Sequence, residues 1–185
     1  MDSQSEVQPV VTLNNGVKMP QIGLGTYTMA TEGDRAAFKA AIMEVGYRHI
    51  DTAAFFKNLE TIGEILLECF EEGLKREELF ITTKIFCTDF EEPEASLGKA
   101  LASLGLDYVD QYLVHVPINM YDEDKQQHRR VPMHRLWAKL EKLYDQGRTR
   151  SIGVSNFNVQ LTLDLLSYAR VRPAVNQIEL HPYLP

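Results

Sequence analysis

The chain has 185 residues, with 26 acidic against 19 basic side chains and a formal net charge of −7 at pH 7. With 44% hydrophobic and 24% charged residues, its composition is that of an ordinary globular domain. The net negative charge argues against a nucleic-acid partner or an acidic membrane surface.

A β-hairpin is predicted near the N-terminus. Val10–Leu13 and Val17–Met19 are short extended runs on either side of Asn14-Asn15-Gly16, and an Asn-Gly pair between apolar runs is a strong hairpin signal. Residues 1–8 are expected to form a disordered leader. They have no basic start and no apolar run follows them, so no signal peptide is predicted.

Beyond the hairpin, short runs rich in Ile, Val and Leu alternate with longer segments of helical period. The predicted strands are Gln21–Leu24, Arg48–Asp51, Leu79–Lys84, Val109–His115, Arg150–Ser155 and Ala174–Glu179. The predicted helices are Asp34–Val45, Asn58–Glu72, Glu94–Leu104, Met133–Asp145 and Val159–Tyr168. After the first strand, strand starts recur about every 31 residues, which is the period of a strand-helix unit.

Strands that are apolar on both faces and joined by helices indicate a parallel sheet, which has two common forms. A doubly wound sheet normally carries a glycine-rich phosphate loop after its first strand. Here Ile22–Tyr27 lacks the third glycine and opens no immediate helix, so that fingerprint fails. The other form is a TIM (β/α)8 barrel, whose chemistry lies at the carboxyl ends of the strands.

Polar residues follow one strand after another at the predicted carboxyl ends. Taken singly, each has an ordinary explanation: Lys84 emerges into solvent, His115 is a hydrogen-bonded structural histidine, and Asp51 caps a turn. In a barrel, however, an acid, an amine and an imidazole on consecutive strands would meet at one mouth. The complete set is Gly25, Thr26, Tyr27, Asp51, Thr52, Lys84, His115, Ser155, Asn156, Asn176, Gln177 and Glu179.

Six ordered motifs carry a resemblance to a known family. They are Gly23–Tyr27, Gly46–Ala53, Leu79–Lys84, Tyr112–His115, Ile152–Phe157 and Asn176–Tyr183. From about residue 10 to its last residue, the sequence resembles the aldo-keto reductases. The resemblance implies a TIM barrel that reduces aldehydes or ketones with a hydride from NADPH, with a small carbonyl compound as its partner.

The resemblance also implies roles for single residues. Asp51, Lys84 and His115 match the family's catalytic aspartate, lysine and histidine. An ammonium near a phenol favours the ionised phenol, which helps a tyrosine exchange a proton near neutral pH. The residues matched to the cofactor site are Gly25, Thr26, Tyr27 and Asp51, together with the nicotinamide-carboxamide set Ser155, Asn156 and Gln177.

The first departure from the family falls on the proton donor. A tyrosine is expected in the pattern Asp-x-Ala-x-x-Tyr, where this chain has Phe56. A phenyl ring keeps the packing but has no hydroxyl, and neither Phe55 nor Lys57 restores one. Water or His115 would then sustain slow reduction, or the chain is an inactive relative or an engineered knockout.

The second departure is length. Eight strand-helix units need roughly 250 residues, whereas this sequence ends after the sixth predicted strand. The resemblance implies that the seventh and eighth strands carry the aromatic under the nicotinamide and the basic loop that grips the adenosine phosphate. We therefore expect an incomplete barrel of one domain, weak NADP binding and open edges on the first and sixth strands. Such edges imply self-association through them, a partner chain that supplies the last strands, or poor solubility.

Smaller features complete these expectations. Val116 stands where many relatives have tryptophan, which predicts a less aromatic substrate pocket. Tyr121–Arg130 is expected to be a solvated loop that borders that pocket. Cys69 and Cys87 fit neither a disulfide framework nor a metal knuckle, so a reducing cytosol and no metal are expected. The alternatives to an impaired reductase are a non-catalytic binding or regulatory relative and a truncated product that is stable only as an oligomer.

Overall fold

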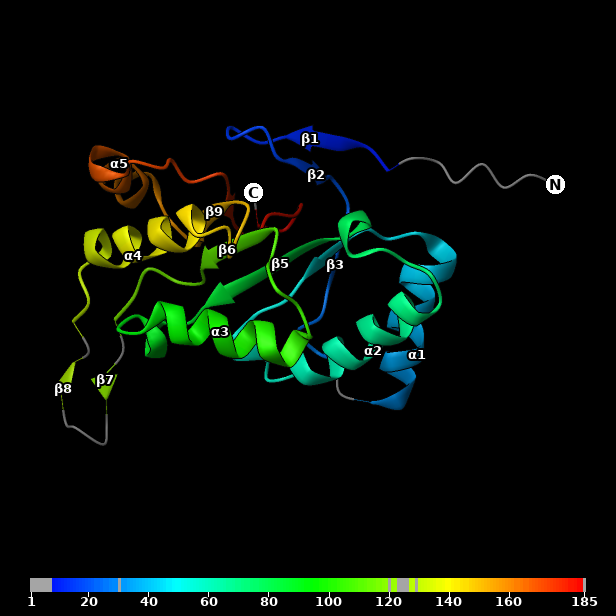
Figure 1. Cartoon of the computed structure of the whole chain (residues 1–185). Helices are drawn as coiled ribbons and strands as arrows, with labels where there is room; N and C mark the ends of the chain where they lie inside the picture. The colour runs from blue at the N-terminus through cyan, green and yellow to red at the C-terminus, as the bar shows by residue number, and fades with distance from the viewer. Residues whose placement is uncertain (1–7, 30, 120, 123–126, 129, 185) are drawn as a thin grey trace.

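The computed structural model describes residues 8–29, 31–119, 121–122, 127–128 and 130–184. At its centre is one curled parallel sheet with helices on its outer side (Figure 1). Its strands are β3 (Gly23–Gly25), β4 (His49–Asp51), β5 (Phe80–Ile85), β6 (Gln111–Val114), β9 (Ile152–Ser155) and β10 (Asn176–Gln177). They lie in the order β10-β9-β6-β5-β4-β3, so the predicted parallel α/β half-barrel is confirmed, with β3 and β10 as open edges.

Each helix packs beside the next one along the chain, in the manner of the outer ring of a barrel. The helices are α1 (Glu32–Ala40), α2 (Leu59–Glu71), α3 (Pro93–Leu104), α4 (Met133–Asp145) and α5 (Val159–Tyr168). Short turns η2 (Ala54–Phe56), η3 (Arg76–Glu78) and η4 (Cys87–Asp89) connect other elements. Among the described residues, no helix is long and apolar enough to cross a bilayer.

The first helix differs from its prediction at both ends. It begins at Glu32 rather than Asp34, because the Thr31 side chain accepts from the Asp34 backbone while the Asp34 side chain accepts from Thr31. The last five predicted residues form a π-helical turn, η1 (Ala41–Val45), that ends at Gly46 with φ 89°. Glycine adopts this left-handed conformation freely, so Gly46 caps the carboxyl end of the helix.

The predicted N-terminal hairpin is confirmed and closes the amino end of the sheet. Its strands β1 (Val10–Thr12) and β2 (Lys18–Pro20) pair antiparallel across a turn at Gly16. The Asn14 and Asn15 side chains donate to the carbonyls of Pro173 and Arg150, at 2.9 and 3.0 Å. The hairpin thereby lies across the starts of β9 and β10, at the amino end of the sheet (Figure 1).

One segment predicted to be a loop contains a short antiparallel ladder instead. Strands β7 (Tyr121–Asp122) and β8 (Gln127–His128) pair with each other between β6 and α4. Pairing of this kind over a few polar residues carries no clear periodic signal in the sequence. Residues 123–126 and 129 of that predicted loop, and residues 1–7 of the predicted leader, fall outside the described residues.

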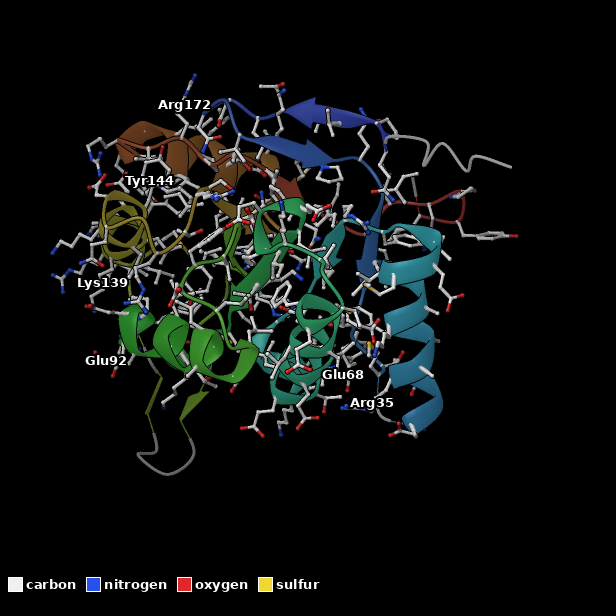
Figure 2. All side chains as sticks on the ribbon, turned by 45° about the vertical axis from the view of Figure 1, so that its right-hand side comes forward. Arg35, Glu68, Glu92, Lys139, Tyr144 and Arg172 are labelled. Carbon is white, nitrogen blue, oxygen red and sulfur yellow. The ribbon has the colours of Figure 1, made fainter. Side chains whose placement is uncertain are left out.

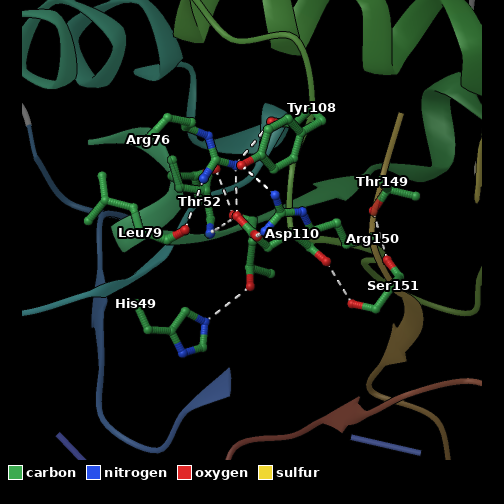
Figure 3. A network of polar contacts seen from close by, with 11 residues as sticks. His49, Thr52, Arg76, Leu79, Tyr108, Asp110, Thr149, Arg150 and Ser151 are labelled. Atoms are coloured by element: carbon green, nitrogen blue, oxygen red, sulfur yellow. Dashed lines mark hydrogen bonds and ion pairs between the residues drawn. The ribbon is translucent and has the colours of Figure 1, made fainter. Parts of the chain in front are cut away.

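A buried acid ties the amino ends of neighbouring strands together (Figure 3). The Asp110 side chain, only 3% exposed, accepts from Arg76 at 2.7 Å and from the Ile81 backbone at 2.9 Å, and pairs with Arg150 at 3.3 Å. The guanidinium groups of Arg76 and Arg150 both contact the Tyr108 ring, 4.1 and 4.2 Å from its centroid. This network joins η3, β5 and the segments that lead into β6 and β9, and it fixes their relative positions.

The apolar core lies between the sheet and the helices, whose outer faces are charged. Arg35 of α1 lies beside Glu68 of α2 (Figure 2), and Lys39 pairs with both Glu68 and Glu72 at 2.8 Å. Exposed pairs like these contribute little to stability. Burial of side chains such as Trp137, Ile65 and Leu97 is the larger contribution.

Two helical glycines allow a matched test of this packing. A Cβ at Gly63 of α2 would lie 2.2 Å from the Ser103 carbonyl oxygen of α3, whereas at Gly98 the nearest atom would be 3.9 Å away. We expect Gly63→Ala to lower the free energy of unfolding by about 1–3 kcal/mol or more. Gly98→Ala should be neutral or stabilising by up to about 1 kcal/mol, since alanine favours helix. Urea unfolding of both variants checks this, and equal effects would contradict the close helix contact.

The open sheet edges predict self-association. Ile178, Leu180 and Tyr183, beside edge strand β10, are 52%, 67% and 94% exposed. Sedimentation velocity should show a concentration-dependent mass, which Ile178→Lys lowers because a charge at an edge opposes strand pairing. Leu67→Lys, at an equally exposed position on α2, should change nothing. A concentration-independent monomer boundary with cooperative thermal unfolding would contradict the prediction.

Candidate active site

Alternation along the strands places two ionisable groups on the concave face of the sheet. Ile50 and Ile81 point towards the helices and are fully buried, so Asp51, at the end of β4, and Lys84, on β5, point to the other side. The Lys84 ammonium lies 2.7 and 2.6 Å from the two carboxylate oxygens of Asp51. The acid and the amine thus meet at one end of the sheet as predicted and form an ion pair, and Lys84 does not emerge into solvent.

Lys84 is held by as many acceptors as it has N–H groups. Its third contact is the Thr52 carbonyl oxygen, at 3.0 Å, and its side chain is only 3% exposed against 21% for Asp51. Burial lowers the pKa of Lys84, and the Asp51 carboxylate acts in the opposite direction. The Asp51 carboxylate therefore stabilises the charged form of Lys84 within the sheet.

His115 follows β6 directly and lies in an aromatic setting. Its ring is edge-on to Phe55, Phe56 and Phe86, with centroids 5.7 to 6.0 Å apart. Its Nδ1 atom is buried without a hydrogen-bond partner among the described residues. Burial lowers the pKa of His115, the positive charge of Lys84 lowers it further, and Asp51 opposes both. The lowered pKa favours the neutral imidazole at pH 7, in which one ring nitrogen donates and the other accepts.

Phe56 occupies the place where the family resemblance predicts a proton-donating tyrosine. Its ring centroid lies 5.2 Å from the Lys84 ammonium and 5.8 Å from the His115 ring, and Tyr27 packs edge-on against it at 4.9 Å. Turn η2 places the ring there and ends at Lys57, in the left-handed conformation with φ 58°. The amine and the imidazole therefore flank a ring that has only C–H groups.

The three residues matched to the nicotinamide lie at the same edge. Ser155 donates to the Gln177 carbonyl at 2.8 Å, and the Asn156 side chain donates to the His115 carbonyl at 2.9 Å and to the Ser155 hydroxyl at 3.1 Å. The Gln177 side chain donates to Asp51 at 3.0 Å, across the concave face. We call these contacts the relay; they connect the Asp51 carboxylate to the backbone of His115.

The first-strand residues differ in what they offer. The Thr26 side chain is fully buried and donates to the Asp51 carbonyl at 3.1 Å, so it supports the end of β4. Gly25 has open space where a Cβ would lie, and the Tyr27 ring is 63% exposed. Of the three, Gly25 and Tyr27 are accessible to a ligand at this edge.

Sequence reasoning missed the aromatic rings beside the site. Val116 predicts a less aromatic pocket, but Phe55 and Phe86 stack on each other beside His115, with centroids 4.3 Å apart. The available signal was the pair of phenylalanines after Ala54, together with Phe86 placed two residues after Lys84. The Gln177 contact with Asp51, 126 residues away, had no signal in the sequence.

A curled parallel sheet whose ionisable side chains gather at its carboxyl edge defines a protein of the (β/α)-barrel class. The sequence profile described as the aldo/keto reductase family matches residues 21–185. The chain belongs to this family.

Named relatives support the same assignment. Glycerol 2-dehydrogenase (NADP(+)) of Saccharomyces cerevisiae is 40% identical over 95% of this chain and 61% of its own length. NADPH-dependent codeinone reductase 1-4 of Papaver somniferum is 39% identical over 98% and 60%. A crystal structure of Bombyx mori aldo-keto reductase in complex with NADP superposes with a TM-score of 0.85, at 38% identity, over 94% of this chain and 59% of that one. The chain thus spans about three fifths of the length of these relatives.

The Asp51–Lys84 pair predicts an asymmetric response to substitution. Asp51→Asn leaves a buried ammonium without its counter-ion and should cost about 3–5 kcal/mol at pH 7. Lys84→Met should cost less, because Asp51 is partly exposed and keeps its contact with Gln177.

The pH dependence of Asp51→Asn follows from the lowered pKa of Lys84. Between that pKa and the ordinary lysine value, the unfolded chain binds more protons, so stability rises with pH. Asp51→Asn removes the influence that raises this pKa, and its deficit should therefore shrink from pH 7 to about pH 9.5. Urea unfolding at both pH values checks this, and a deficit that is independent of pH would contradict it.

Proposed function

We propose that this protein is an NADP-dependent oxidoreductase that reduces the carbonyl group of a small aldehyde or ketone, with proton transfer slowed by Phe56. The observation that carries the proposal is the Asp51–Lys84 pair, which with His115 surrounds the Phe56 ring. Family membership and relatives whose names include NADP support the same reaction class.

The residues present suit the nicotinamide end of the cofactor. A carboxamide has one carbonyl acceptor and an NH2 donor, and the side chains of Asn156 and Gln177 and the Ser155 hydroxyl offer complementary groups at one edge. When bound, NADPH supplies the hydride. Asn156 and Gln177 would orient the carboxamide, each giving up contacts that it makes within the relay.

Neither Phe56 nor the two ionisable groups that flank it is a ready source of the proton for the carbonyl oxygen. Phe56 has no acidic hydrogen, and the three N–H groups of Lys84 all have acceptors. His115 has a lowered pKa, so it is neutral and donates a hydrogen bond more readily than a proton. His115 therefore positions the carbonyl oxygen, and water at the mouth supplies the proton slowly.

A second candidate is a non-catalytic relative that binds a ligand at this edge. The observation that favours it is Phe56, since this ring fills the space between the amine and the imidazole without contributing chemistry. The two candidates differ in whether NADPH is oxidised in the presence of a carbonyl compound.

The names of the relatives refer to glycerol and to codeinone, so family membership does not fix the substrate.

We propose the cytosol as the cellular compartment of this protein. Cys69 and Cys87 are both buried as free thiols, which suits a reducing environment.

Restoring the hydroxyl tests the assignment of Phe56. Phe56→Tyr places a phenol beside Lys84 and His115 and should raise the rate of carbonyl-dependent NADPH oxidation by about two to four orders of magnitude. Phe70→Tyr adds the same hydroxyl on α2, away from the site, and should leave the rate unchanged.

The change in nicotinamide fluorescence is used first to measure NADPH binding in all variants. If Phe56→Tyr binds NADPH but is no faster than its parent, the assignment is wrong and the non-catalytic candidate is favoured.

A further inference from the structure

His49 lies outside the candidate active site and links the N-terminal hairpin to the concave face of the sheet. It opens β4 two residues before Asp51, so both side chains project to the same side of that strand. Its Nδ1 atom lies 3.2 Å from the carbonyl oxygen of Pro20 on β2, and its Nε2 atom lies 3.1 Å from the hydroxyl oxygen of Thr82 on β5. The ring is half-buried, so a proton can reach it from solvent.

The contacts of His49 continue to a third strand of the sheet. The Thr82 hydroxyl is buried and lies 3.4 Å from the Oε1 atom of Gln111 on β6, whose side chain is also buried. We call the Pro20 carbonyl, the His49 ring, the Thr82 hydroxyl and the Gln111 amide the His49 network. The Nε2 atom of Gln111 is buried and has no partner among the described residues. A buried donor without an acceptor costs free energy, so this orientation of the amide needs a compensating contact.

The number of hydrogens decides which contacts of the His49 network are hydrogen bonds. The network has three contacts, and the oxygens at its two ends, on Pro20 and Gln111, only accept. Thr82 contributes one hydrogen and a neutral imidazole contributes one more, which leaves one contact without a hydrogen. An imidazolium contributes two, so all three contacts are then hydrogen bonds. The observed orientation of the Gln111 amide therefore suits protonated His49.

A half-turn of the Gln111 amide satisfies the same groups around neutral His49. The nitrogen and the oxygen of an amide are alike in size, so the turned amide fits the same space. Gln111 Nε2 then donates to Thr82, Thr82 donates to His49 Nε2, and His49 Nδ1 donates to Pro20. Every contact again has a hydrogen, and the buried NH2 group has gained an acceptor. His49 Nδ1 donates to Pro20 in both arrangements, so the hairpin keeps this contact.

We propose that the His49 network is a pH-sensitive switch, in which protonation of His49 reverses its hydrogen bond with Thr82 and turns the Gln111 amide by half a turn. With neutral His49 the hydrogen bonds run in one direction, from β6 towards β2. With the imidazolium they run outwards from His49 to both ends of the network. The switch is independent of the proposed function, since no ligand or cofactor takes part in it.

The surroundings of His49 set the pH range of the switch. Burial is the largest influence and lowers the pKa of His49. The Pro20 carbonyl and the carboxylates of Asp51 and Asp110 raise this pKa, while the Lys84 ammonium lowers it. Since the net effect is a lowered pKa, we expect the neutral state at pH 7 and the protonated state only below the ordinary histidine value of about 6.5. Asp51 and Lys84 belong to the candidate active site, so their charges and that of His49 influence one another.

An NMR titration of the full chain between about pH 7.5 and pH 5 tests the switch through two kinds of signal. The ring-nitrogen signals of His49 report its protonation and show which nitrogen carries the hydrogen of the neutral form. We expect this hydrogen on Nδ1, and we expect the side-chain NH2 signals of Gln111 to shift with the same midpoint as the ring. Gln111→Met identifies the NH2 signals by their loss. It also removes the acceptor for Thr82 in the protonated state, so it should lower the pKa of His49 by about 0.5–1 unit.

Two threonine variants separate the switch from a simple effect of charge. Thr82→Val keeps the shape of the side chain and removes the hydroxyl through which His49 acts on Gln111. The Gln111 signals should therefore no longer follow the His49 titration in this variant. Thr83→Val is the matched control, because it removes an equally buried hydroxyl from the opposite face of β5. It should leave both titrations unchanged.

Several results would overturn the proposal. Gln111 signals that stay constant across the His49 titration would show that the amide does not turn. Gln111 signals that move as much in Thr82→Val as in the parent would show a charge acting through space. A neutral ring with its hydrogen on Nε2, or a ring that stays neutral until the protein unfolds, also contradicts the switch. So does an unchanged His49 pKa in Gln111→Met, a result that does not depend on whether Thr82→Val folds.

Discussion

The buried ammonium of Lys84 is the constraint on which the arrangement of the site depends. Removing a lysine from water costs several kcal/mol, and the cost is offset only where acceptors are in place. Asp51 and the Thr52 carbonyl supply them, which requires β4 and β5 to keep their parallel register. A shift of that register by one residue would turn Lys84 towards the helices and leave its charge unpaired.

The amino end of the sheet carries contacts that stabilise the fold, whereas the carboxyl end carries the candidate site. At the amino end, Asp110 with its two arginines and the N-terminal hairpin fix the starts of the strands. At the carboxyl end lie the Asp51–Lys84 pair, His115 and the partly exposed rings of Tyr27 and Phe55. This is the usual division in barrel proteins, where the amino face is structural and the carboxyl face carries the ligand.

Sequence reasoning recovered what local patterns encode. Apolar periodicity located every strand of the sheet, and its order along the chain brought Asp51, Lys84 and His115 to one edge. It did not recover features that depend on distant contacts or local winding. The stacking of Phe55 on Phe86 depends on how turn η2 aims Phe55, and no pattern in the sequence predicts that α1 continues as a π-helical turn. No periodicity could have paired Gln177 of β10 with the Asp51 carboxylate of β4, since three other strands lie between these two in the sheet.

The relay couples ligand binding at Gln177 to the hydrogen bonding of Asp51. In this structure the Gln177 amide is bound to Asp51, and through Ser155 and Asn156 the same contacts reach the backbone of His115. Any molecule that takes this amide for itself must first detach it from the carboxylate, so part of its binding free energy is spent on that exchange. Linkage makes the effect reciprocal, because whatever strengthens the hold of Asp51 on Gln177 weakens the molecule's affinity by the same factor. Ligand binding to the Gln177 amide and the hydrogen bond from this amide to Asp51 therefore exclude each other.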